Sequence, residues 1–288
     1  IKSEFILKKI FLNLQKNTSL KMIKYNKIVQ KRLKVELNDF INYSKIEIEI
    51  IPLNEGNGNY INIPENEKES HFHLYIDNNK DEIKIKELNN KKNIKIIKII
   101  IDNEVKSFHG LFKFCRHIKS ITFKKFYRNN IKDMSWMFSW NDSLEEINLS
   151  NINTINTLNM NHMFYRCSSL KELNLSNLDT RNVIDMSSMF ENCSSLEKIN
   201  LSNFNTEKVN NMKSMFDGCS CLKELKITNF ITNIVTLMNS MFAKCFSLKK
   251  LKFSNLNKIK ISKVYRLFYE CFSLKQLDSF NLENNKNN

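Results

Sequence analysis

The chain has 288 residues, of which 42% are hydrophobic and 11% aromatic, and it carries a formal net charge of +15. This is ample apolar material for a folded core and argues against a disordered chain. No apolar run approaches the about 20 residues that span a bilayer, so we expect no transmembrane segment in this chain.

Residues 1–34 form a basic N-terminal extension with ten Lys or Arg against the single acid Glu4, which accounts for +9 of the net charge. The apolar residues from Phe5 to Leu14 are spaced as in an amphipathic helix, but Lys8 and Lys9 interrupt the core that a signal peptide needs. We expect a basic, helical extension.

Residues 35–107 are predicted to form a small β-rich capping segment. Isoleucines alternate with polar residues at Ile46, Ile48 and Ile50, and the same alternation recurs up to residue 101, with Gly56 and Gly58 marking turns. The last apolar run, residues 94–101, lies seven residues before the next segment, so we expect it to pair with the first strand there and to seal that end.

Residues 108–283 contain seven copies of a 26-residue unit, followed by a polar tail at residues 284–288. The unit shows most clearly in one phenylalanine that returns every 26 residues without insertion or deletion, at Phe112, Phe138, Phe164, Phe190, Phe216, Phe242 and Phe268. A fixed period of this length is typical of repeat proteins whose units stack on their neighbours.

The first half of each unit predicts a short helix. Apolar residues stand at i, i+3, i+4 and i+7, as in Met186, Met189, Phe190 and Cys193, which is one face of a helix. In four copies this series follows a residue suited to the N-cap position, namely Asp133, Asn159, Asp185 and Asn211.

The second half of each unit predicts a strand, because Leu173 and Leu175, like Ile199 and Leu201, are two residues apart and therefore point to the same side. We thus expect an α/β fold, a leucine-rich-repeat-like solenoid with one short strand and one short helix in each repeat.

The segment 186–206 resembles the BspA-type leucine-rich repeat, the 26-residue repeat of bacterial, mycoplasma and protist surface proteins. The resemblance covers residues 108–283. It implies a solenoid whose strands line one face, often at the cell surface and used for adhesion or other protein contacts, and it implies no catalytic residues. The first copy departs from the pattern at Phe123 and Phe126, as a capping unit does, and the last has Ser279 in place of a strand leucine.

The chemistry-bearing residues predict neither an enzyme nor a cofactor. Six of the seven cysteines occupy one repeat position, so we expect buried thiols, with disulfides between successive repeats as the alternative. His71 and His73 share a face of a predicted strand, and a solvated face is favoured there over a metal pair. There is no Ser, His and Asp set, no paired carboxylates and no glycine-rich phosphate loop.

The side chain between two inward strand residues points outward. The resulting row predicts a binding face at Asn148, Asn174, Asn200, Lys226, Lys250 and Lys252. Its lysines favour an anionic macromolecule, such as an acidic protein. We expect no nucleic-acid partner, because no RNP-like motif or basic helical stripe occurs. The alternative is that the row is merely solvated.

These observations predict a non-enzymatic interaction protein, adhesin-like, at the cell surface or secreted. The rival hypothesis is an intracellular leucine-rich-repeat scaffold or adaptor in the cytoplasm, and a degenerate enzyme or an enzyme inhibitor is a third. Asn148, Asn174 and Asn200 each begin an Asn-Leu-Ser glycosylation motif. The motif is a weak indication of secretion, because the repeat pattern itself produces it.

Overall fold

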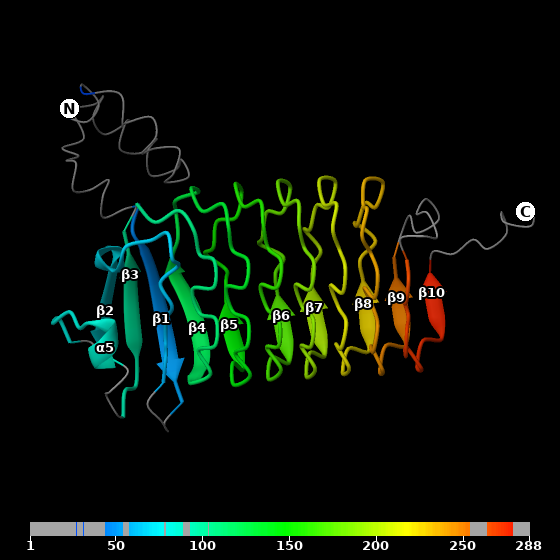
Figure 1. Cartoon of the computed structure of the whole chain (residues 1–288), viewed down its shortest axis with the longest axis horizontal. Coiled ribbons are helices and arrows are strands. Elements are labelled where there is room, and N and C mark those ends of the chain that lie inside the picture. Colours follow the sequence, from blue (N-terminus) through cyan, green and yellow to red (C-terminus); the bar gives the residue numbers. More distant parts are fainter. Residues whose placement is uncertain are drawn as a thin grey trace, which may run out of the picture.

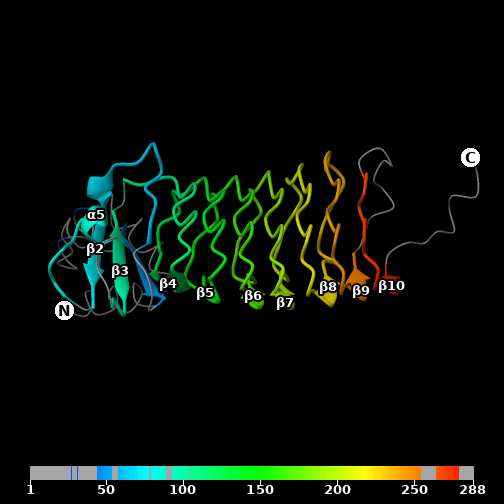
Figure 2. The same cartoon turned by 60° about the horizontal axis from the view of Figure 1, so that its bottom comes forward.

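The computed structural model describes residues 44–53, 58–77, 79–88, 93–102, 104–253 and 264–278, together with Lys27 and Lys31. Strands are the main regular secondary structure of this part of the chain, and they lie side by side in one long row in both views (Figures 1 and 2). The predictions for residues 1–34 and 284–288 lie outside the described residues, apart from the two lysines.

A mixed sheet of five strands forms the N-terminal end, in the order β2-β3-β1-β4-β5. Isoleucines at alternate positions of β1 and β3 are fully buried, so the alternation read from the sequence does mark inward-facing side chains. The strands are β1 (Ile46–Pro52), β2 (Phe72–Ile76), β3 (Ile97–Ile101), β4 (Ile118–Lys125) and β5 (Glu146–Asn148), and two single helical turns, η1 (Glu69–His71) and α5 (Ile85–Leu88), accompany them.

The expected pairing of residues 94–101 with the first repeat strand is wrong. That strand, β4, pairs with β1 in antiparallel register, with Ile50 opposite Ile121, while β3 lies between β1 and β2. Both β1 and β3 alternate buried isoleucines, so the pattern of apolar residues does not distinguish them as the neighbour of β4.

From residue 108 onward each repeat forms one coil as far as the structure describes it, so that the first coil is 108–133, the second 134–159 and the third 160–185. Every coil contributes a short strand, and parallel pairs form between β4 and β5, between the next two strands, and among the last three. These strands are β5, β6 (Glu172–Asn174), β7 (Lys198–Asn200), β8 (Glu224–Lys226), β9 (Lys250–Lys252) and β10 (Gln276–Asp278).

The predicted helix in each repeat is wrong, and with it the α/β class. In the fourth coil, backbone N–H groups donate across to the next coil instead of to the carbonyl four residues back, over 2.7 to 3.0 Å. The donors are Met186, Ser188, Phe190 and Asn192, and their acceptors are Asn211, Lys213, Met215 and Asp217. The segment is therefore a run of tight turns bonded to its neighbour.

Two residues of every coil have a left-handed backbone, which no α-helix tolerates. Their φ angles lie between 53° and 74°. They are the third and seventh residues of each coil, namely Gly110, Phe114, Trp136, Trp140, His162, Arg166, Ser188, Asn192, Ser214, Gly218, Ser240, Lys244, Arg266 and Glu270. Because these turns repeat every four residues, they bury the same i, i+3, i+4 and i+7 positions that a helix would.

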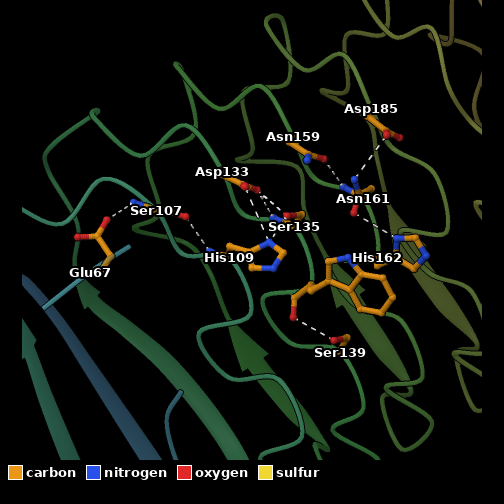
Figure 3. A network of polar contacts seen from close by, with 11 residues as sticks. Glu67, Ser107, His109, Asp133, Ser135, Ser139, Asn159, Asn161, His162 and Asp185 are labelled. Atoms are coloured by element: carbon orange, nitrogen blue, oxygen red, sulfur yellow. Dashed lines mark hydrogen bonds and ion pairs between the residues drawn. The ribbon is translucent and has the colours of Figure 1, made fainter. Parts of the chain in front are cut away.

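The predicted N-caps keep their hydrogen bond without a helix. The side chain of Asp185 accepts from the backbone N–H of Ser187 over 2.8 Å, and Asn159 does the same for Asn161 over 3.0 Å. Asp133, Asn159 and Asp185 occur at the same place in successive coils, joined by parallel bridges, and Figure 3 shows the polar network around them. They close the first turn of each coil.

The core is a continuous stack of phenylalanine rings along the coils. Phe190 is completely buried, and its ring lies 5.7 Å from Phe164 and 5.3 Å from Phe216, centroid to centroid. The enclosure of Phe190 by its two repeat partners, expected from the period, is thereby confirmed.

A column of thiols runs beside the rings. The Cys193 thiol donates to the Phe164 carbonyl at 3.1 Å, and Cys167, Cys219, Cys245 and Cys271 make the same bond one coil back. In the second coil Asn141 takes the place of cysteine and donates to Phe112 and Phe138 at 2.8 and 2.9 Å. All seven cysteines are free, so the repeat position serves packing, and successive coils are not linked by disulfides.

We expect one fast-reacting thiol per native chain, Cys221, the only cysteine that is exposed. Burial raises the pKa of Cys193 to about 12 and that of Cys219 well above its usual value, so these thiols present almost no reactive thiolate. Labelling with iodoacetamide at pH 8, followed by peptide mass mapping, measures the order of reaction. Cys221→Ser should remove the fast phase, and rapid labelling of Cys193 in the folded protein would contradict the buried column.

Candidate functional site

The strand row of the stack is where the sequence placed a binding face, and the six predicted residues lie on it. All six are exposed, because each flanks a strand residue that points into the stack. The parallel register sets Asn174 beside Asn200 and Lys226 beside Lys252. The row Asn148, Asn174, Asn200, Lys226, Lys252, together with Lys250, is called the strand face below.

The three asparagines of the strand face have a structural task. Asn148 accepts from the backbone N–H of Ser150 over 3.0 Å, and Asn174 and Asn200 accept from Ser176 and Ser202 over 3.2 and 3.1 Å. Each side chain thus closes the turn that follows its strand, as asparagine commonly does. This role explains the asparagines without any ligand.

Lys226 and Lys252 stand at the same position but have no side-chain acceptor to close the turn. They are register partners on β8 and β9, so two exposed lysines lie on adjacent strands about 4.8 Å apart. Neighbouring basic side chains on one surface favour an anionic partner.

Ion pairs between coils hold other charged side chains of the strand row in place. Lys198 lies 2.5 Å from Glu172, and Lys250 lies 3.2 Å from Glu224. The hydrogen bond that Lys198 donates to Glu172 raises the pKa of Lys198. Lys250 is therefore paired within the protein, and such exposed pairs add little to stability.

Two shallow depressions of opposite character lie along the strand face. The earlier one carries Glu145, Glu146 and Glu172 beside Lys171. The later one carries Glu197 and Glu224 among five lysines, Lys198, Lys223, Lys226, Lys250 and Lys252. The charge of the face therefore changes sign along the stack.

The remaining candidates for chemistry are accounted for by local contacts. His73 lies between two carboxylates, with Nδ1 3.0 Å from Glu82 and Nε2 3.1 Å from Asp102. His71 is the last residue of η1 and not part of β2, so the two histidines do not share a strand face as expected. Within the described ranges no group of three or more His, Cys, Asp or Glu is placed to hold a metal ion, and no helix there is long and apolar enough to cross a membrane.

A second surface was not predicted from the sequence. Both tryptophans of the chain stand at left-handed turn positions in the second coil, where they contact rings and cations from the coils on either side. The repeat itself carried a signal, because aromatic rings occupy four of these six positions in the first three coils, where later coils have Ser188, Ser214 and Gly218.

The structure defines a repeat protein built of 26-residue coils with one short strand each. Residues 106–220 and 185–288 match the family described as Mycoplasma protein of unknown function, DUF285. The two matches together cover more than half of the chain, which therefore belongs to that family. The curated proteins and the solved structures compared with the chain give no match.

Proposed function

We propose that this protein is a non-enzymatic interaction module, adhesin-like, which binds an anionic macromolecule through the basic part of its strand face. The observation that carries the proposal is the in-register pair Lys226 and Lys252, exposed within a depression that five lysines line. The similarity of the repeat to BspA-type repeats of surface proteins supports a place at the cell surface or outside the cell.

An intracellular scaffold or adaptor is the second candidate, and one observation favours it. All seven cysteines are free, as is usual in reducing compartments, whereas secreted proteins commonly oxidise theirs. Treating intact cells with a protease that cannot enter them separates the two candidates, since only a surface protein is cleaved while a cytoplasmic marker survives.

The binding test uses heparin, a sulfated polyanion, immobilised on a column and titrated in solution. We expect the double reversal of Lys226 and Lys252 to Glu to weaken binding about tenfold. Each reversal removes one attraction and adds one repulsion, and four such exposed charge terms together amount to about 1 to 2 kcal/mol. The affinity of the unmodified protein should fall as salt rises, because exposed charges are screened.

The matched control reverses Lys213 and Lys244 to Glu, which changes the net charge equally on exposed turns away from the strand face. This variant should keep the affinity of the unmodified protein within about twofold. Equal weakening by both double variants would mean that heparin affinity depends only on the net charge of the protein. The strand face would then not be the binding site.

A further inference from the structure

The tryptophan turns form a surface that no part of the core requires. We call the residues that build it the aromatic–cation patch: Lys113, Phe114, Trp136, Trp140, His162 and Arg166. They come from the first three coils, and five of the six occupy left-handed turn positions. Phe114 is 48% exposed and the tryptophans are half-buried, so the patch is open to solvent.

Holding aromatic residues in this backbone conformation is unfavourable, and the later coils avoid it. Bulky residues with positive φ are uncommon, and strained positions of this kind gather at functional sites. The equivalent residues of the fourth and fifth coils are Ser188 and Ser214 at the first turn and Asn192 and Gly218 at the second. The coil itself therefore does not need aromatic side chains there.

The rings of the patch are stacked in two columns across the coils. In the first, the Lys113 ammonium lies 4.3 Å from the Trp136 ring centre and the His162 ring stacks on Trp136 at 3.9 Å. Because Lys113 and His162 belong to the coils on either side, they cover opposite faces of Trp136. Burial lowers the pKa of His162 to about 4, so this ring adds no positive charge near neutral pH.

In the second column Trp140 lies between Phe114, whose ring is stacked 5.4 Å away, and the Arg166 guanidinium, 4.2 Å from the ring centre. Arg116 lies farther off, 5.9 Å from Trp140, and also 3.7 Å from Asp142. Both tryptophans thus have their faces occupied by their own neighbours.

This arrangement presents cations and ring edges to solvent, and both attract anions. The edge of an aromatic ring is its positive part, and the rings hold Lys113 and Arg166 in place before any partner arrives, which reduces the ordering cost of binding. A nucleobase would need a free ring face to stack on, and the tryptophans offer none.

Acidic residues in the next coils limit how long an anionic partner can be. The residues that take the place of Lys113 in the fourth and fifth coils are Glu191 and Asp217, and the acid Glu191 helps burial to raise the pKa of Asp217 to about 6. A long polyanion or an anionic membrane lying along this edge would meet these carboxyl groups. A short anionic segment would not.

We propose that the aromatic–cation patch binds a short acidic segment of a partner protein. Its Asp or Glu carboxylates pair with Arg166 and Lys113, and Arg166 can hold a carboxylate through two parallel hydrogen bonds. Trp, Tyr and Arg are the residue types that dominate the binding energy of protein interfaces, and Tyr165 completes the set beside Trp136 and Trp140. This site is separate from the strand face and does not depend on the function proposed for it.

The probe is an acetylated peptide of eight glutamates, compared with a Gly-Ser peptide of the same length. Tryptophan emission reports binding directly, because both tryptophans of the chain lie in the patch. We expect saturable change with the acidic peptide, no change with the Gly-Ser peptide, and at least about tenfold weaker binding in the double variant Lys113→Gln, Arg166→Gln.

Two further variants separate the patch from simple charge. Lys244 holds the same coil position as Arg166, so Lys213→Gln with Lys244→Gln removes equal charge from later coils and should change the affinity less than twofold. Trp140→Leu removes no charge but takes away the ring under Arg166, and should weaken binding about fivefold or more.

Loss of affinity in both double variants alike, or an unchanged emission with the acidic peptide, overturns the proposal. Tighter binding of an eight-residue oligothymidylate or of phosphatidylserine vesicles than of the peptide also overturns it, by assigning the patch to nucleic acid or membrane. Reversal of Lys226 and Lys252 should leave the emission response intact. The proposals for the patch and for the strand face can therefore be refuted independently.

Discussion

Replacing Phe190 with alanine should lower the free energy of unfolding by about 3 to 5 kcal/mol, the usual cost of emptying a fully enclosed phenylalanine site. The ring is completely buried between Phe164 and Phe216, and its removal leaves a cavity that the neighbouring coils cannot fill without moving their own rings. Urea denaturation of the purified protein measures the loss.

The matched comparison is Phe268→Ala in the seventh coil. Phe268 occupies the same repeat position, but it is only partly buried, and its ring stacks on Phe242 at 5.5 Å. We expect a clearly smaller loss there. Equal losses at the two positions would show that the phenylalanines do not act as one stacked core.

The second large effect is expected at Asn141. Its buried side-chain amide donates to two carbonyls, Phe112 and Phe138, and thereby ties the second coil to the first. Alanine would remove both hydrogen bonds and leave a void, at a cost of about 2 to 3 kcal/mol. Thermal or urea unfolding again provides the measurement.

Cysteine at this position is the informative control, because five other coils use a cysteine thiol for the same bond across coils. The side-chain oxygen of Asn141 is buried without a partner, and Asn141→Cys removes that unfavourable atom while keeping a donor. We expect Asn141→Cys to be within about 1 kcal/mol of the unmodified protein. A loss as large as that of alanine would show that the amide has a task the thiol cannot perform.

Much of the stack could be predicted from the repeat alone. The period of 26 residues fixed which phenylalanines meet, and the pairs of apolar residues two apart located the strands, as in Leu173 of β6. The outward position of Asn174 and Lys226 followed from the alternation within a strand. These features are local or strictly periodic, and both properties can be read without coordinates.

The helix could not be excluded from the same pattern. A run of four-residue turns buries positions i, i+3, i+4 and i+7 just as a helix does, and Asp185 accepts the same backbone N–H in either case. What decides between them is the neighbouring coil, whose carbonyls accept the hydrogen bonds that a helix would keep to itself. Residues such as Trp136 and Arg166 also conceal the left-handed positions, which glycine would have revealed.

The candidate site was predicted only in part. Exposure of the strand face followed from the sequence, but the turn-closing role of Asn148 and the ion pair of Lys250 with Glu224 depend on how side chains meet across turns and coils. The aromatic–cation patch depends on contacts between residues about 26 positions apart whose turn positions had been read as helical. Its recognition therefore required the correct backbone.

The stacking of coils through their turn segments is tested most directly at Gly218, whose backbone N–H donates to the carbonyl of Ala243 over 2.8 Å. Ala243 is the only alanine of the sequence, and there are four glycines. In protein labelled with ¹⁵N-glycine and ¹³C-carbonyl alanine, the Gly218 nitrogen and the Ala243 carbonyl carbon are therefore the labelled pair that this hydrogen bond joins. A coupling between the two nuclei reports the hydrogen bond. The stacked coils predict that this coupling is observed by nuclear magnetic resonance. If the segment were a helix, Gly218 would donate to Ser214, which carries no label, and the spectrum would show no coupling to Ala243.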